Sequence, residues 1–88
     1  MNRLVFDESM YVRIEVAKLG YGLDILIKDK LTDVRCQVAK QGYGLDILLH
    51  DKSPYVRAEV ARQGYGLDVL KNDKSRIVQK VIAEILSK

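Results

Sequence analysis

The chain has 88 residues, a net charge of +3, an apolar fraction of 48% and a charged fraction of 31%. This length allows one small domain, and the composition is typical of a folded globular protein, which excludes a disordered or collagen-like chain. No apolar run approaches membrane-spanning length, and the start, MNRLVF followed by Asp7 and Glu8, turns acidic too early for a secretory signal. We therefore expect a cytoplasmic protein that does not contact a membrane.

The motif GYGLD occurs at residues 20–24, 42–46 and 64–68, so the sequence repeats itself every 22 residues. Residues at the same place in successive repeats are called a column below. The predicted units, in chain order, are a remnant of a preceding repeat at 1–6, full repeats at 7–28, 29–50 and 51–72, and a partial last repeat at 73–88. Together they make a single repeat domain.

Each repeat is predicted to contain two helices. Its apolar residues are spaced three or four apart, as at Val56 and Val60, which is a helical spacing. The first helix is expected to begin after a serine cap, as at Ser53 before a proline, and to end at the first glycine of GYGLD. Because the second repeat has Leu31 in place of the serine, its cap is predicted to shift to Thr32. The second helix is expected to be very short, or a single 3₁₀ turn.

Valine and alanine columns form the predicted core. One repeat cannot bury such a stripe alone, so successive repeats must stack, and the fold class is an all-α solenoid of two-helix repeats. The members of the three columns are Val12, Val34, Val56 and Val78; Val16, Val38, Val60 and Ile82; and Ala17, Ala39, Ala61 and Ala83.

The stretches DESMYVRIEVAKLG, DKLTDVRCQVAKQG and DKSPYVRAEVARQG resemble the second-helix signature of HEAT-like repeats, an aspartate followed by Val-Arg and then alanine. The short period and abbreviated second helix are also similar to those of leucine-rich variant repeats. The resemblance covers the three full repeats and the partial fourth. It implies a right-handed superhelix and, most often, protein binding, with nucleic-acid binding and cofactor-associated examples as minorities.

An arginine column is interrupted only in the last repeat, where Gln79 takes its place. The resemblance implies that each arginine bonds to a loop aspartate of its own or a neighbouring repeat. Recognition of a phosphate or carboxylate ligand is the alternative. The arginines are Arg13, Arg35 and Arg57, and the aspartates are Asp7, Asp29, Asp51 and Asp73.

Tyrosines recur between the two glycines of each loop, at Tyr21, Tyr43 and Tyr65. They are predicted to line up on one edge of the stack as a partner-binding row, because tyrosine offers a large contact area with little entropy to lose. Tyr11 and Tyr55, on the first helix, are candidates to extend this surface. The alternative is that each ring packs over the neighbouring repeat and seals the loop.

Two basic columns raise nucleic-acid binding as an alternative function, since together they could follow a phosphate backbone. Aspartates interleave with them at close range, which favours a solvated surface of mixed charge. The columns are Lys18, Lys40 and Arg62, and Lys30, Lys52 and Lys74.

The last helix carries an additional apolar stripe at Ile77, Val81 and Ile85, where the second repeat has polar residues. Three explanations remain open: the helix closes the end of the stack, the stripe pairs with its twin in a homodimer, or it docks another protein. Our hypothesis is self-association through this helix.

The chain has one cysteine, Cys36, and one histidine, His50, which provide neither a nucleophile and base pair nor a metal site of usual spacing. We expect no enzymatic activity, no cofactor and no metal. The leading interpretation is a protein-interaction scaffold. The alternatives are a nucleic-acid-binding repeat protein and a small inhibitor or adaptor that occupies a larger protein.

Overall fold

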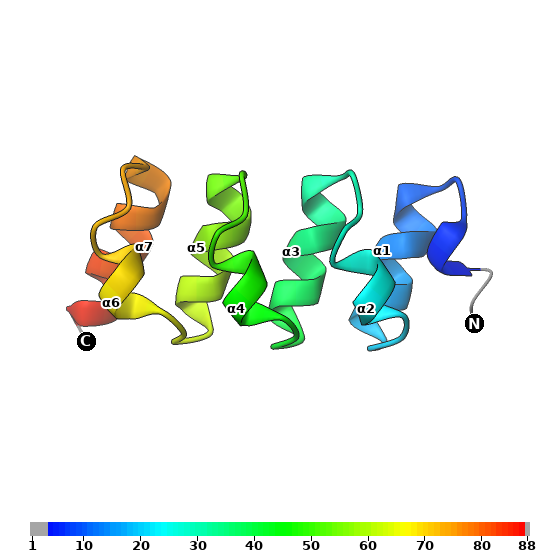
Figure 1. Cartoon of the computed structure of the whole chain (residues 1–88), viewed down its shortest axis with the longest axis horizontal. Helices are drawn as coiled ribbons and strands as arrows, with labels where there is room; N and C mark the ends of the chain where they lie inside the picture. Colours follow the sequence, from blue (N-terminus) through cyan, green and yellow to red (C-terminus); the bar gives the residue numbers. More distant parts are fainter. Residues whose placement is uncertain (1–3, 88) are drawn as a thin grey trace.

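The computed structural model describes residues 4–87, and every regular element in this range is helical (Figure 1). Long and short helices alternate along the chain, as the two-helix repeat predicts. In chain order the elements are the 3₁₀ helix η1 (Leu4–Phe6) and the α-helices α1 (Met10–Lys18), α2 (Leu23–Leu26), α3 (Thr32–Lys40), α4 (Leu45–Leu48), α5 (Pro54–Arg62), α6 (Leu67–Leu70) and α7 (Arg76–Leu86).

The long helices lie side by side in a row (Figure 1). Helix α1 contacts α3, α3 contacts α5 and α5 contacts α7, and the structure measures 41 × 19 × 18 Å. The short helices α2, α4 and α6 lie along one side of this row, and each contacts both the long helix before it and the one after it. Every junction between repeats therefore has the same arrangement, in which two successive long helices pack together with the short helix that connects them.

The starts of the long helices are fixed by serines and by loop aspartates. The hydroxyl groups of Ser53 and Ser75 each accept a hydrogen bond from the backbone N–H two residues later, at 3.2 Å. The cap residue of α3 is Leu31, and Thr32 is already helical, so the predicted shift of this cap to Thr32 is wrong. The carboxylate of Asp29 accepts the N–H of Leu31 at 2.9 Å, which fixes this loop without a serine.

The paired glycines of the GYG loops meet two separate requirements. Gly42 follows α3 with a φ of 75°, a left-handed conformation that ends the helix. Gly44 precedes α4 with a φ of 63°, and a Cβ atom there would collide with the side chain of Ile27 from the preceding repeat. The helix that follows is one α-helical turn, so the 3₁₀ alternative does not apply.

The core consists of columns that are buried between successive long helices. Leu48 in the short helix α4 is 1% exposed, and burial of a leucine side chain stabilises a fold by about 1.5–3 kcal/mol. The same column supplies one such leucine to each full repeat. The buried columns are Leu26, Leu48 and Leu70; Val34, Val56 and Val78; Val16, Val38, Val60 and Ile82; and Ala17, Ala39 and Ala61.

Candidate partner-binding surfaces

The tyrosines of the GYG loops lie where each long helix turns into its short helix. Tyr21, Tyr43 and Tyr65 are 49%, 41% and 40% exposed, so each ring is held against the protein over part of its surface and is accessible over the rest. The backbone N–H of Tyr43 donates to the carbonyl of Val38 at 3.4 Å, which ties the loop to α3. We call this row of three residues the tyrosine edge.

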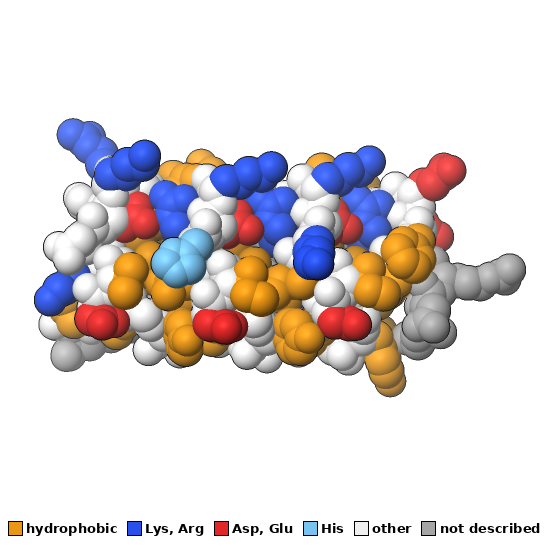
Figure 2. Space-filling view, in the orientation of Figure 1, with side chains coloured by type: hydrophobic (Ala, Val, Ile, Leu, Met, Phe, Trp, Pro, Cys, Tyr) orange, Lys and Arg blue, Asp and Glu red, His pale blue; other side chains and the backbone are white. Residues whose placement is uncertain are grey.

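An acidic row accompanies the tyrosine edge. Asp24, Asp46 and Asp68 lie in the first turns of α2, α4 and α6, where negative charge suits the helix dipole. All three are exposed, and none takes part in the ion pairs found within residues 4–87. Ile47 and Val69 are exposed in the same short helices. Figure 2 shows acidic side chains in a row along the lower margin, interleaved with hydrophobic groups, and basic side chains along the upper margin.

The arginine column lies inside the junctions between repeats. Arg35 donates from Nε to Oδ2 of Asp51 at 2.8 Å and from Nη2 to Oδ1 at 3.1 Å, while its Nη1 donates to the backbone carbonyl of Asp29 at 2.7 Å. Arg13 and Arg57 make the equivalent contacts. Each arginine thus joins the loop of its own repeat to that of the next. We call these contacts the arginine–aspartate ladder, and they occupy the guanidinium groups that a phosphate or carboxylate ligand would need.

The ladder ends at the last repeat. Gln79 donates from Nε2 to the backbone carbonyl of Asp73 at 2.7 Å, the equivalent of the Nη1 contact that each arginine makes within its own repeat. Burial alone raises the pKa of the Asp73 carboxyl, but hydrogen bonds from Arg57 and from the backbone N–H of Ser75, together with the Arg57 charge, outweigh it and hold this pKa below its ordinary value.

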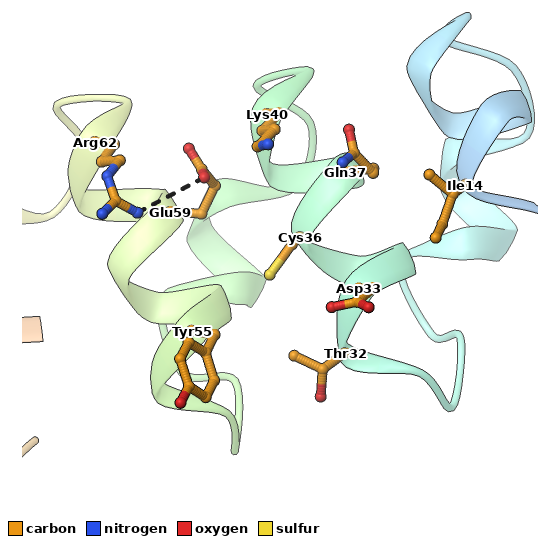
Figure 3. A pocket seen from close by; sticks show the side chains of 9 residues that line it. All are labelled: Ile14, Thr32, Asp33, Cys36, Gln37, Lys40, Tyr55, Glu59 and Arg62. Carbon is orange, nitrogen blue, oxygen red and sulfur yellow. Dashed lines mark ion pairs between the residues drawn. The ribbon is translucent and has the colours of Figure 1, made fainter. Parts of the chain in front are cut away.

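A groove of about 610 Å³ lies between α3 and α5 on the long-helix side of the row (Figure 3). Its charged residues include Asp33, Lys40, Glu59 and Arg62, and the two last form a loose ion pair at 3.9 Å. Burial, followed by the charges of Glu59 and Asp33, raises the pKa of the Cys36 thiol to about 11. The thiol is therefore protonated at neutral pH and is a poor nucleophile.

The remaining two candidate tyrosines lie elsewhere. Tyr11 and Tyr55 are exposed in the first turns of α1 and α5, at the opposite ends of the long helices from the GYG loops. Tyr55 lines the groove between α3 and α5 (Figure 3). These two residues therefore do not continue the tyrosine edge.

The apolar stripe of the last helix faces the interior, which corrects the expectation of an exposed surface for self-association or docking. Val81 is 4% exposed, and Ile77 and Ile85 are partly buried against the core. Helix α7 contacts α5 and α6, so this stripe packs back against the row. Its polar counterparts in the second repeat are more solvent-exposed than Val81, and the apolar residues close the last junction more completely.

The opposite side of α7 carries a group of polar residues that was not predicted as a surface from the sequence. Gln79, Lys80 and Glu84 are exposed there, in columns that elsewhere face the next repeat. The signal was present in the sequence, since Lys80 occupies the column of Ile14, Cys36 and Ala58. Polar side chains at these positions suit a face that contacts water.

Within the part of the chain that the structure describes, no three His, Cys, Asp or Glu side chains come together as a group that could hold a metal ion. None of the helices in residues 4–87 has the length and apolar character needed to cross a membrane. Comparisons of the chain with protein-family models, curated proteins and solved structures gave no match.

Proposed function

We propose that the chain is a non-enzymatic scaffold, a right-handed α-solenoid of HEAT-like repeats that binds another protein along the tyrosine edge in the cytoplasm. The observation that carries this proposal is the partial exposure of Tyr21, Tyr43 and Tyr65 at the same position in three successive repeats. Regular presentation of three aromatic rings provides the kind of anchor residues that dominate the binding energy of protein interfaces.

The support beneath these rings favours binding because it is already ordered. The double-glycine turns fix the loops that carry the tyrosines, as seen at Gly42 and Gly44, and the arginine–aspartate ladder fixes the other loop of each repeat, as seen at Arg35. A ring that is held before binding loses little conformational freedom when a partner arrives. Tyrosine adds to this advantage because its side chain has only two rotatable angles.

The acidic row indicates the chemistry of the partner. Asp24, Asp46 and Asp68 place one exposed carboxylate three residues after each tyrosine, and Ile47 and Val69 add exposed apolar area in the same short helices. Complementary charge guides association and excludes partners of like charge. The partner should therefore present lysine or arginine side chains together with apolar ones along one continuous segment.

Site-directed photo-crosslinking tests this proposal. A crosslinking amino acid at Tyr43 should capture a specific protein from an extract of the source cells, while the same group at Lys52, on the opposite margin, should not. Excess wild-type chain should compete for capture, and a competitor carrying Tyr21→Ala and Tyr65→Ala should not. Equal competition by both chains would rule out the tyrosine edge. The captured protein also decides whether the chain acts as an inhibitor or adaptor of a larger protein.

Nucleic-acid binding is the second candidate, and it is favoured by a different observation. Lys30, Lys52 and Lys74 are all exposed, one per repeat, on the loops that precede the long helices. Binding of a phosphate backbone by these side chains would weaken steeply with added salt, because each contact releases condensed counterions. A fluorescent oligonucleotide titrated at 50 and 200 mM salt distinguishes the two functions, since the lysine-to-alanine triple variant should lose this binding while tyrosine variants keep it.

A further inference from the structure

The N-terminal end of the row exposes positions that are buried in the other repeats. Leu4 is 39% exposed, whereas Leu26, Leu48 and Leu70 of the same column are each 1% exposed. Val12 is partly exposed, whereas the later valines of its column are fully buried. These positions are covered wherever a long helix precedes them. The surface that remains open within residues 4–87 is called the N-terminal end face and comprises Leu4, Asp7, Tyr11, Val12, Glu15 and Leu19.

Asp7 is prepared for a contact that its column makes in every later repeat. Its carboxylate accepts the N–H of Ser9 at 2.8 Å, and its carbonyl accepts Nη1 of Arg13 at 2.6 Å, as the later aspartates do for their own repeats. The later aspartates also receive two hydrogen bonds from the arginine of the preceding repeat. No residue within 4–87 forms an ion pair with Asp7. A donor from a preceding helix would complete this position.

The C-terminal end of the row exposes the complementary side of a long helix. Ala83 is exposed in α7, although the alanines of its column are fully buried beneath the next long helix in the earlier repeats. Gln79, Lys80 and Glu84 surround it. These four residues form what we call the C-terminal end face, and α7 is a long helix of the kind that the N-terminal end face lacks.

The internal junctions show which columns would meet if these two faces joined. Cys36 of α3 projects into the groove that it shares with Glu59 of α5, and Lys40 shares the same groove with Arg62 (Figure 3). The corresponding residues at the ends of the row are Lys80 with Glu15, and Glu84 with Lys18. Both pairs carry opposite charges, whereas the internal pair of Lys40 and Arg62 carries like charges.

We propose that a second copy of the chain docks its C-terminal end face on the N-terminal end face of the first, so that copies stack head to tail. Helix α7 of one copy then covers Leu4 and Val12 of the next, and the amide of Gln79 lies opposite Asp7. Such a contact uses two different surfaces, so it repeats and builds an open row of copies. Because Gln79 is neutral, the contact is weaker than an internal junction and depends on protein concentration.

Charge reversal combined with sedimentation equilibrium tests the proposal, with protein concentrations from about 10 µM to about 1 mM covering weak association. Lys80→Glu and Glu15→Lys should each weaken association about tenfold, because each replaces an attractive pair with a repulsive one. An equimolar mixture of these two single variants should recover association, with the two variants alternating along the row. Lys52→Glu reverses an exposed charge away from both end faces, so it should leave association unchanged.

A gain of association provides an independent test. Gln79→Arg restores the arginine of the column and should strengthen association at least about tenfold, because a charged bidentate contact to Asp7 replaces a neutral one. Asp7→Asn in the same chain should remove this gain, while circular dichroism verifies that both variants fold. Monomers at every concentration for both the wild type and Gln79→Arg would overturn the proposal. Association that ignores the Lys80 reversal would overturn it as well, by assigning self-association to another surface. Tyrosine-edge variants should have no effect, so this test is separate from that of the proposed function.

Discussion

Replacement of Arg35 by alanine provides the most direct measure of what holds successive repeats together. The side chain is 5% exposed and makes three hydrogen bonds, two to the Asp51 carboxylate and one to the Asp29 carbonyl. Its removal leaves a nearly buried carboxylate without its counter-charge, which typically costs about 3–5 kcal/mol. Arg35→Gln should cost about 1 kcal/mol less than Arg35→Ala, because an amide at this position keeps the carbonyl contact, as Gln79 shows, although it also leaves Asp51 without its counter-charge.

Urea unfolding followed by circular dichroism at 222 nm gives these free energies. Arg62→Ala is the matched control, since Arg62 is 53% exposed and its ion pair with Glu59 spans 3.9 Å. A loose pair in which the arginine is exposed contributes at most about 1 kcal/mol, and its contribution falls with added salt, although the Glu59 side chain itself is only 11% exposed. A loss for Arg35→Ala no larger than that for Arg62→Ala would refute the view that the ladder stabilises the junctions.

Three further predictions concern single residues. Gly44→Ala should cost about 2–4 kcal/mol in urea unfolding, since it combines a left-handed backbone with a collision, whereas Gly42→Ala, which meets no neighbouring atom, should cost about 1–2 kcal/mol. Alkylation of Cys36 at pH 8 should be about tenfold slower or more in the folded chain than in urea, because its pKa is raised from 9.0 to about 11, which reduces the thiolate fraction; equal rates would contradict the burial of the thiol. The lowered pKa of Asp73 contributes stability that is present above about pH 4 and is lost as the pH falls through the folded-state pKa, so Asp73→Asn should reduce stability at pH 7 and flatten its decline in acid.

The repeat period predicted most of the local structure. A 22-residue recurrence of glycines and valines located each long helix, the left-handed turn at Gly42 and the buried columns, because these features depend on residues close together in the sequence. The start of α3 was missed because the cap residue Leu31 has no side-chain acceptor, and its own N–H is bound by the Asp29 carboxylate. In every repeat the loop aspartate accepts a hydrogen bond from the backbone N–H two residues later. Propensity rules for helix starts consider mainly the residue at the cap, so they do not include this contact.

The orientation of the last helix was beyond the reach of periodicity. Helical spacing identifies residues that share a face, such as Ile77 and Val81, but it does not say whether that face meets the preceding or the following repeat. Comparison of columns resolves this. Val81 belongs to the column of Glu59, which faces the preceding repeat, whereas Lys80 belongs to the column of Ala58, which faces the following repeat. An apolar stripe on the last helix therefore indicates an exposed surface only when its columns are the ones that face the following repeat.

The arginine–aspartate ladder also gives the row a direction. Each arginine reaches forward to the aspartate of the next repeat, so the two ends of the row differ in chemistry: one presents an acceptor at Asp7, and the other presents the position where a donor would stand. Arginine at position 79 would give the two ends the same arginine donor and aspartate acceptor as an internal junction. Gln79 keeps the hydrogen bond to the backbone carbonyl of its own repeat, but it lacks the positive charge with which each arginine reaches the aspartate of the next repeat. The same column that stabilises the interior thus limits, through one residue, how strongly the ends can join.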